Sequence, residues 1–355
     1  MAVLLRVHIM DLIPGDQLLN DTFNHAGVLV LRKDSTLTHE SIARLLQHNI
    51  DYIDIIERKI DVEPTMDKSP SLTTYNKINQ QFHHAINQFE HLFLAVLAGG
   101  TYEDNKIEQL LQPVVSTLEE QKDVVSLLLL LHQQQTDDYT YNHSLQVGML
   151  SYYIAKWLNY SDQEAYLVSK AGFLIDIGTS KISPTIVNKP DRLTKEEFAE
   201  IKKHPEYSYD IIMESTQDEI SALVALQHHE REDGSGYPKG LRSDDIHPYA
   251  KIIAVADVYT AMISNRVYQT KQELLTVLKQ LNTLSFGKLS PEPTQALIKH
   301  LLPNFIGKKV LLSTGQSGII VMTNQTDYFR PLVQTDTNFI DLARKPDITI
   351  QEVYL

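Results

Sequence analysis

The sequence predicts a mainly helical protein with a small β-rich module at each end. In the middle of the chain, apolar residues recur at helical spacing, and one helix face would carry His143, Val147, Leu150, Ile154 and Trp157. Near both ends, short apolar runs are instead separated by turn-forming glycine, proline, asparagine and aspartate, a pattern that is typical of strands. We therefore expect an all-helical central domain between two β modules.

These patterns divide the chain of 355 residues into five segments. The alternation of apolar and polar positions predicts a β-rich module over residues 1–60, and a Pro- and Ser/Thr-containing linker follows at 61–72. Residues 73–135 form a helical connector, whose phenylalanine stripe favours a core face over a dimer seam. We expect the helical domain at residues 136–303 and a small barrel of the SH3-like kind at residues 304–355.

The composition is typical of a soluble globular protein and excludes several kinds of site. The net charge of −13 opposes nonspecific binding to DNA or anionic lipid, because both are themselves negatively charged. The chain has no cysteine, so any metal ligands would be His, Asp or Glu. The longest apolar runs are too short to span a bilayer, and we recognise no signal peptide. We therefore expect a cytoplasmic protein.

The chemistry is concentrated in residues 228–241, which read HHEREDGSGYPKGL. Two adjacent histidines end a helical stretch there and run into a glycine-rich loop. Neutral imidazole is the commonest protein metal ligand, and glycine lets a backbone turn tightly or approach a ligand closely. Alone, however, a His-His pair at a helix end is more often a polar cap than a metal site.

The complete stretch closely resembles the HHE-x-x-DGSGYP-x-GL signature of HD-GYP domains, which are bacterial metal-dependent hydrolases of cyclic di-GMP. The resemblance covers residues 137–302 and includes segments similar to the family's other motifs around His143, Asp176 and His204. A lone histidine such as His143 on an apolar helix face would usually be a core residue. Asp257 is the ligand best supported by physics alone, since a carboxylate in an apolar run is costly to bury without a partner. The full ligand set that the resemblance implies is His143, Asp176, His204, His228, His229 and Asp257.

The resemblance also implies roles for these residues. Asp176 would be the catalytic residue and would bridge two metal ions. A mixture of imidazole and carboxylate ligands suits Fe or Mn, and indicates Zn less specifically. The loop residues Gly236, Tyr237 and Pro238 would shape the floor for the nucleotide. Arg266 would pair with a phosphate, which suits its planar guanidinium, although alone it would be taken for an exposed helix-end cation.

This chain departs from the family pattern on one side of the site. Ile175 stands where the family has its HD-motif histidine, and Thr179 stands where it has a lysine. Thr260 and Gln269 replace an aspartate and a basic residue. One metal position therefore keeps only three ligands, whereas the position formed by Asp176 and the three later histidines is complete. We expect about one tightly held divalent ion.

Two functions follow, and the sequence leaves both open. The first is a metal-dependent phosphodiesterase of cyclic di-GMP with weakened or lost activity. The second is a catalytically inactive module that binds a nucleotide or a signalling partner protein. A more distant third option is hydrolysis of another nucleotide, because pocket chemistry rather than fold sets the substrate. A homodimer is compatible with any of the three.

Overall fold

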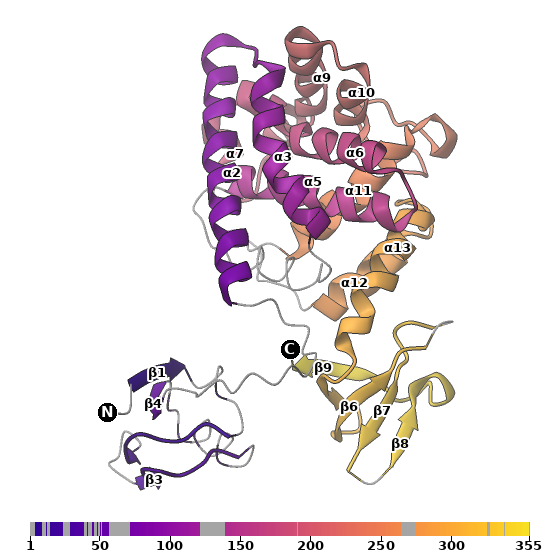
Figure 1. Ribbon diagram of the computed structural model, residues 1–355. Helices are drawn as coiled ribbons and strands as arrows, with labels where there is room; N and C mark the ends of the chain where they lie inside the picture. Colours follow the sequence, from indigo (N-terminus) through magenta and orange to yellow (C-terminus); the bar gives the residue numbers. More distant parts are fainter. Residues whose placement is uncertain are drawn as a thin grey trace. The chain divides into compact units, whose positions relative to one another are not determined.

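The computed structural model divides the chain into two compact units, residues 1–67 and 68–355 (Figure 1). The structure describes the chain except for residues 1–3, 9–11, 13–14, 24–28, 39–40, 42–44, 46–47, 49, 51, 57–71, 121–138, 190, 264–273, 325–326, 337 and 355. Most of the expected linker at residues 61–72 therefore lies outside the described part.

The first unit contains two small antiparallel sheets, as the alternating sequence pattern predicted. Strand β1 (Leu4–His8) pairs with β4 (Tyr52–Ile56), and β2 (Thr22–Phe23) pairs with β3 (Leu29–Leu31). Apolar side chains from several segments of this unit form its own core, which includes Leu18, Leu37, Leu45 and Ile55.

The second unit opens with a helical hairpin. Helix α2 (Leu72–Gly99) and helix α3 (Asp104–Glu120) lie side by side (Figure 1). Gly100, at φ 80°, makes the turn between them, since glycine reaches positive φ without steric cost. The phenylalanine stripe of α2 is indeed a core face, because Phe82 and Phe89 are buried within this chain.

The remaining helices form one packed body. They are α5 (Tyr139–Trp157), α6 (Asp162–Leu174), η2 (Ile177–Lys181), α7 (Pro184–Val187), α8 (Lys195–Ile201), α9 (His204–Thr216), α10 (Glu219–Gln227), η3 (Ser243–Asp245), α11 (Pro248–Ile263), α12 (Leu274–Leu284), α13 (Pro291–Leu301) and η4 (Leu302–Phe305). Helices α5 and α6 pack closely because glycines meet at their crossing: a β-carbon added at Gly172 would lie 3.0 Å from the Cα of Gly148.

The C-terminal segment is a five-stranded antiparallel sheet of order β8-β7-β6-β5-β9. Its strands are β5 (Lys309–Leu312), β6 (Ser317–Met322), β7 (Leu332–Thr335), β8 (Phe339–Asp341) and β9 (Ile350–Tyr354), with a short η5 (Leu342–Arg344) after β8. In the sequence, turn residues separate apolar runs at the first four of these strands, and β9 was not recognised. Val310 and Val333 bury their side chains in the same core as the helices.

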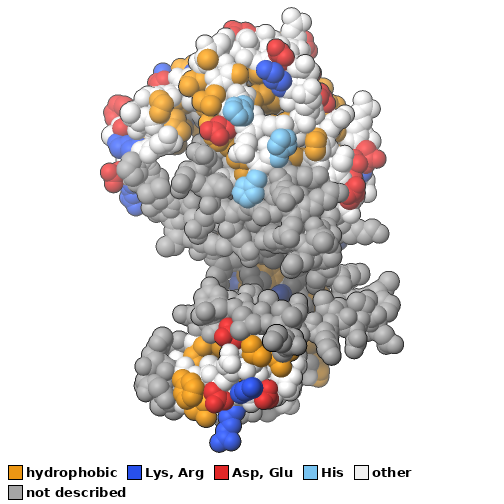
Figure 2. Space-filling view, turned by 60° about the vertical axis from the view of Figure 1, so that its left-hand side comes forward, with side chains coloured by type: hydrophobic (Ala, Val, Ile, Leu, Met, Phe, Trp, Pro, Cys, Tyr) orange, Lys and Arg blue, Asp and Glu red, His pale blue; other side chains and the backbone are white. Residues whose placement is uncertain are grey.

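The surface of the second unit is mixed rather than uniformly charged. On the face seen in Figure 2, histidine side chains reach the surface among apolar and uncharged ones. In the part of the chain that the structure describes, no helix has both the length and the apolar character needed to cross a membrane.

Candidate metal centre

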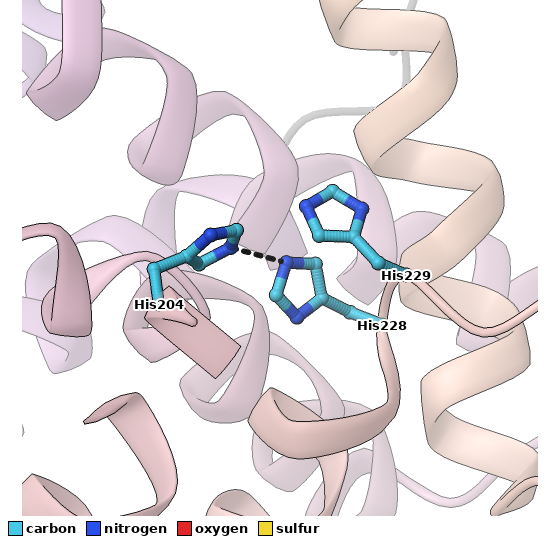
Figure 3. A group of neighbouring side chains, drawn as sticks. All are labelled: His204, His228 and His229. Atoms are coloured by element: carbon cyan, nitrogen blue, oxygen red, sulfur yellow. Dashed lines mark hydrogen bonds between the residues drawn. The ribbon is translucent and has the colours of Figure 1, made fainter. Parts of the chain in front are cut away.

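Three histidines from two loop-and-helix junctions converge in the second unit (Figure 3). His204 is the first residue of α9, and Pro205 follows it at a helical position where proline's missing N–H costs nothing. His228 caps the C-terminus of α10, and His229 begins the loop beyond it. One ring nitrogen from each lies within 4.8 Å of the others, a spacing at which the three could hold one metal ion.

Backbone carbonyls fix the tautomers of two of these histidines. The Nδ1 of His204 lies 2.7 Å from the carbonyl of Ile201, and the Nδ1 of His228 lies 2.6 Å from that of Ala225. A carbonyl oxygen only accepts, so each Nδ1 donates its proton and leaves Nε2 with a lone pair. The two Nε2 atoms face each other at 3.2 Å. Two lone pairs at that distance need a cation between or beside them.

Asp176 supplies a carboxylate to the same point. Its Oδ1 lies 3.3 Å from the Nε2 of His204 and 3.9 Å from that of His228. Its Oδ2 lies 3.9 Å from the Nε2 of His143, on helix α5. Asp176 therefore lies between His143 and the three-histidine group.

Asp257, on α11, joins the opposite side of the group. Its Oδ1 lies 2.9 Å from the Nε2 of His143, and its Oδ2 lies 3.6 Å from the Nδ1 of His229. Burial acts to raise the pKa of Asp257, but the hydrogen bond with His143 and the nearby histidines hold it well below its usual value. The structure thus brings together all six residues that the sequence singled out as metal ligands.

The histidines are in the form that binds metals. Burial, reinforced by His204, lowers the pKa of His228 to about 4. Burial and the neighbouring His228 lower the pKa of His229 well below its usual value. Both imidazoles are therefore neutral near pH 7, which is the ligating form. Because neutral His228 and His229 bring no positive charge to Asp176 and Asp257, a divalent cation suits this donor set.

Local packing sets the position of Asp176. A capping box between Ser161 and Glu164 starts α6, which ends at Leu174, just before Asp176. The Ser208 hydroxyl on α9 donates to the carbonyl of Ile175 at 2.6 Å and accepts from the N–H of Gly178 at 2.9 Å. A β-carbon at Gly178 would overlap the His204 carbonyl, so this close contact between two ligand-bearing segments requires glycine.

The glycine-rich loop is folded around a buried acid that the sequence analysis did not single out. Glu230 is only 2% exposed, and its carboxylate accepts from the N–H groups of Lys239 at 2.7 Å and Leu241 at 2.9 Å. A β-carbon at Gly236 would overlap the backbone at Glu230, so only glycine fits. The Tyr237 ring then lies 4.7 Å from the ring of His229.

Of the other residues expected to bind substrate, the structure describes the three loop residues but not Arg266. Gly236, Tyr237 and Pro238 lie in the loop whose Tyr237 ring packs against His229. Arg266 and Gln269 fall outside the described residues.

The two departures at the HD motif offer no ligand. Ile175 is fully buried and presents an aliphatic side chain. The hydroxyl of Thr179 donates to the backbone carbonyl of Asp176 at 2.7 Å. Lys181, the next lysine along the chain, is exposed. Sequence reasoning also overlooked Lys202, whose Nζ lies 5.1 Å from the centroid of the Tyr237 ring. In the sequence Lys202 is simply the first of two adjacent lysines, and nothing there indicates a role in the site.

Comparison with known proteins finds a family-model match and several relatives. The family model described as HD domain matches residues 116–286. A cyclic di-GMP phosphodiesterase of Pseudomonas aeruginosa is 32% identical over 212 residues, 59% of this chain and 50% of the relative. Another cyclic di-GMP phosphodiesterase, of Thermotoga maritima, is 36% identical over 179 residues, 50% of this chain and 48% of the relative. The chain thus spans about half the length of these curated relatives.

A solved structure shows the same fold. The HDG"Y"P protein Bd1817 of Bdellovibrio bacteriovorus superposes with a TM-score of 0.52 at 19% identity, covering 84% of this chain and 99% of that chain. At this identity the likeness concerns the fold alone.

Proposed function

The chain belongs to the HD-GYP family of HD domains, and from this membership we propose that it is a metal-dependent phosphodiesterase acting on cyclic di-GMP. The observation that carries the proposal is the pair of bare Nε2 atoms on His204 and His228, 3.2 Å apart and next to the Asp176 carboxylate. Such an arrangement is unfavourable unless a cation is bound, so the chain has kept a metal position and not only the fold.

The residues suggest which ion is held and where. His204, His228, His229 and Asp176 would bind one ion, and their mixture of imidazole and carboxylate suits Fe or Mn. When bound, such an ion polarises a phosphodiester and lowers the pKa of a bound water to about 7. His143 and Asp257 remain hydrogen-bonded to each other at 2.9 Å beside this position. With Ile175 contributing no ligand there, we expect a second ion to bind weakly, and turnover to be slow.

The substrate would lie against the loop of Gly236, Tyr237 and Pro238. The carboxylate of Glu230 holds the two ends of this loop together through backbone N–H groups. The loop therefore offers a preformed wall beside His229, which reduces the ordering cost of binding.

A second candidate is a module that binds cyclic di-GMP without hydrolysing it. Ile175 and Thr179 favour it, because together they remove a ligand and a cation that the family resemblance implies. The two candidates share the same pocket and differ only in turnover.

One experiment tests the proposal and separates the candidates. The full chain is purified anaerobically, loaded with Fe or Mn, and incubated with cyclic di-GMP, while chromatography follows the linear dinucleotide. Product that depends on the metal supports the phosphodiesterase. Calorimetric binding without product supports the binding module. Neither binding nor product would refute both, and 3′3′-cGAMP and cyclic di-AMP assayed in parallel would then test for another nucleotide.

A further inference from the structure

The C-terminal end of helix α8 places a cation, Lys202, beside the glycine-rich loop. Phe198 and Lys202 are four residues apart, so their side chains lie on the same side of the helix. The Nζ of Lys202 lies 5.0 Å from the centroid of the Phe198 ring and 5.1 Å from that of Tyr237. Because the Tyr237 ring packs on His229, these contacts connect the ammonium group of Lys202 to the metal centre.

The ammonium group of Lys202 lies against aromatic rings, whereas those of nearby lysines are paired with carboxylates. Lys203 is paired with Glu200 at 2.6 Å, and Lys189 with Glu197 at 2.7 Å. In the described part of the chain, no carboxylate forms an ion pair with Lys202, whose ammonium instead lies over two rings. A cation held by aromatic faces keeps its charge available to an anion.

The helix that carries Lys202 is firmly anchored. Thr194 and Glu197 form a capping box at its start, and Lys189 donates to both carboxylate oxygens of Glu197. Lys202 caps its other end, two residues before His204. The position of its side chain is therefore set by the same junction that places a metal ligand.

We propose that Lys202 binds a phosphate of the cyclic dinucleotide and supplies positive charge that Thr179 cannot supply. A phosphodiester entering this site meets the carboxylates of Asp176 and Asp257, which repel it. A cation beside Tyr237 offsets that repulsion. The inference rests on the proposed function, since it concerns how the same substrate is held.

The test compares two neighbouring lysines in the full, metal-loaded chain. Lys202→Gln should weaken the affinity for cyclic di-GMP about tenfold or more, as expected for loss of a hydrogen bond to a charged group. Lys203→Gln removes the same charge one residue away and should change the affinity less than about twofold, since surface ion pairs contribute little. Lys202→Arg keeps the charge and should retain most of the affinity. The affinity of Lys202→Gln should also depend less on salt, because an exposed charge attraction is screened.

Metal content is measured on the same samples. Unchanged metal in Lys202→Gln, together with weaker binding, supports direct contact with the substrate. Loss of metal would make Lys202 a positioning residue for His204 and overturn the proposal. If wild type binds cyclic di-GMP and both glutamine variants bind equally well, only this inference fails. If wild type itself does not bind, the proposed function fails and the inference with it.

Discussion

The Nε2 atoms of His204 and His228 lie 3.2 Å apart, while the Nδ1 of each ring donates its proton to a backbone carbonyl. This pair explains why the site should keep an ion although Ile175 offers no ligand on one side of it. Without a metal ion, the contact between the two Nε2 atoms is favourable only if one of the rings is protonated. Burial opposes this, because it lowers the pKa of His228.

The first prediction concerns metal content. Elemental analysis after anaerobic purification should find about one equivalent of Fe or Mn in the wild-type chain, since one position has a full ligand set. His228→Ala should lose most of it, because the variant removes a ligand at the centre of the group. His83→Ala, which alters an exposed histidine of α2, should keep the metal. Two or more tightly held equivalents in wild type would contradict the single-ion assignment.

The second prediction concerns the acid inside the loop. Glu230→Gln replaces one of two accepting oxygens with an amide NH₂, which cannot accept the N–H of Lys239 or Leu241. A buried donor left without a partner costs about 1–3 kcal/mol. Hydrogen exchange should therefore show faster exchange at Lys239 or Leu241, and cyclic di-GMP affinity should fall. The control is Glu232→Gln, which alters another acid of the same loop, one paired with Lys251 of α11, and should leave those amides protected. Equal exchange of the two amides in both variants would show that Glu230 does not hold the loop.

The third prediction concerns a lysine between the connector and the metal-binding helices. Lys170, on α6, lies 2.8 Å from Asp104, 3.5 Å from Asp218 and 3.6 Å from Glu108. Lys170→Met should lower the free energy of unfolding by about 1–2 kcal/mol, less than for a fully buried pair because the carboxylates reach solvent. Adding Asp104→Asn to this variant should cost little more, and an additive loss in the double-mutant cycle would mean that the two residues do not interact.

The same lysine predicts a dependence on pH. Burial acts to lower the pKa of Lys170, but the hydrogen bond and charge of Asp104 raise it overall above 10.5. A group whose pKa is raised by folding stabilises the fold below its unfolded pKa and loses that effect as the pH rises through the folded value. The stability difference between wild type and Lys170→Met should therefore persist at pH 7 and shrink only above pH 10.5. A difference that vanishes between pH 7 and 9 would contradict it.

Periodicity predicted the parts of this structure that depend on local patterns. His143 was expected on the buried face of its helix and is 4% exposed, and Asp257 was expected to be buried and is 7% exposed. Strand β9 was missed because its pairing with β5 joins segments about forty residues apart, which no short sequence pattern reveals. Lys202 and Glu230 were missed for a similar reason, since their importance lies in contacts that exist only once the loop is folded.

The last prediction concerns introducing the histidine and lysine that the family resemblance implies. Ile175→His together with Thr179→Lys should raise the turnover of cyclic di-GMP at least about tenfold, because one such electrostatic group often contributes a hundredfold or more. Elemental analysis should show a second ion in the double variant. Each single change should give less, since the histidine without the lysine leaves the developing phosphate charge uncompensated.

Packing sets the condition under which this experiment is informative. Ile175 is fully buried, and its carbonyl accepts from Ser208, so an imidazole must fit into apolar space without moving Asp176. Circular dichroism and the thermal midpoint should therefore match wild type, and Ile175→Leu serves as the control for repacking alone. A folded double variant that binds a second ion and still forms no linear product would assign the block to Thr260, Gln269 or the pocket. Binding without turnover would then be the function of this chain.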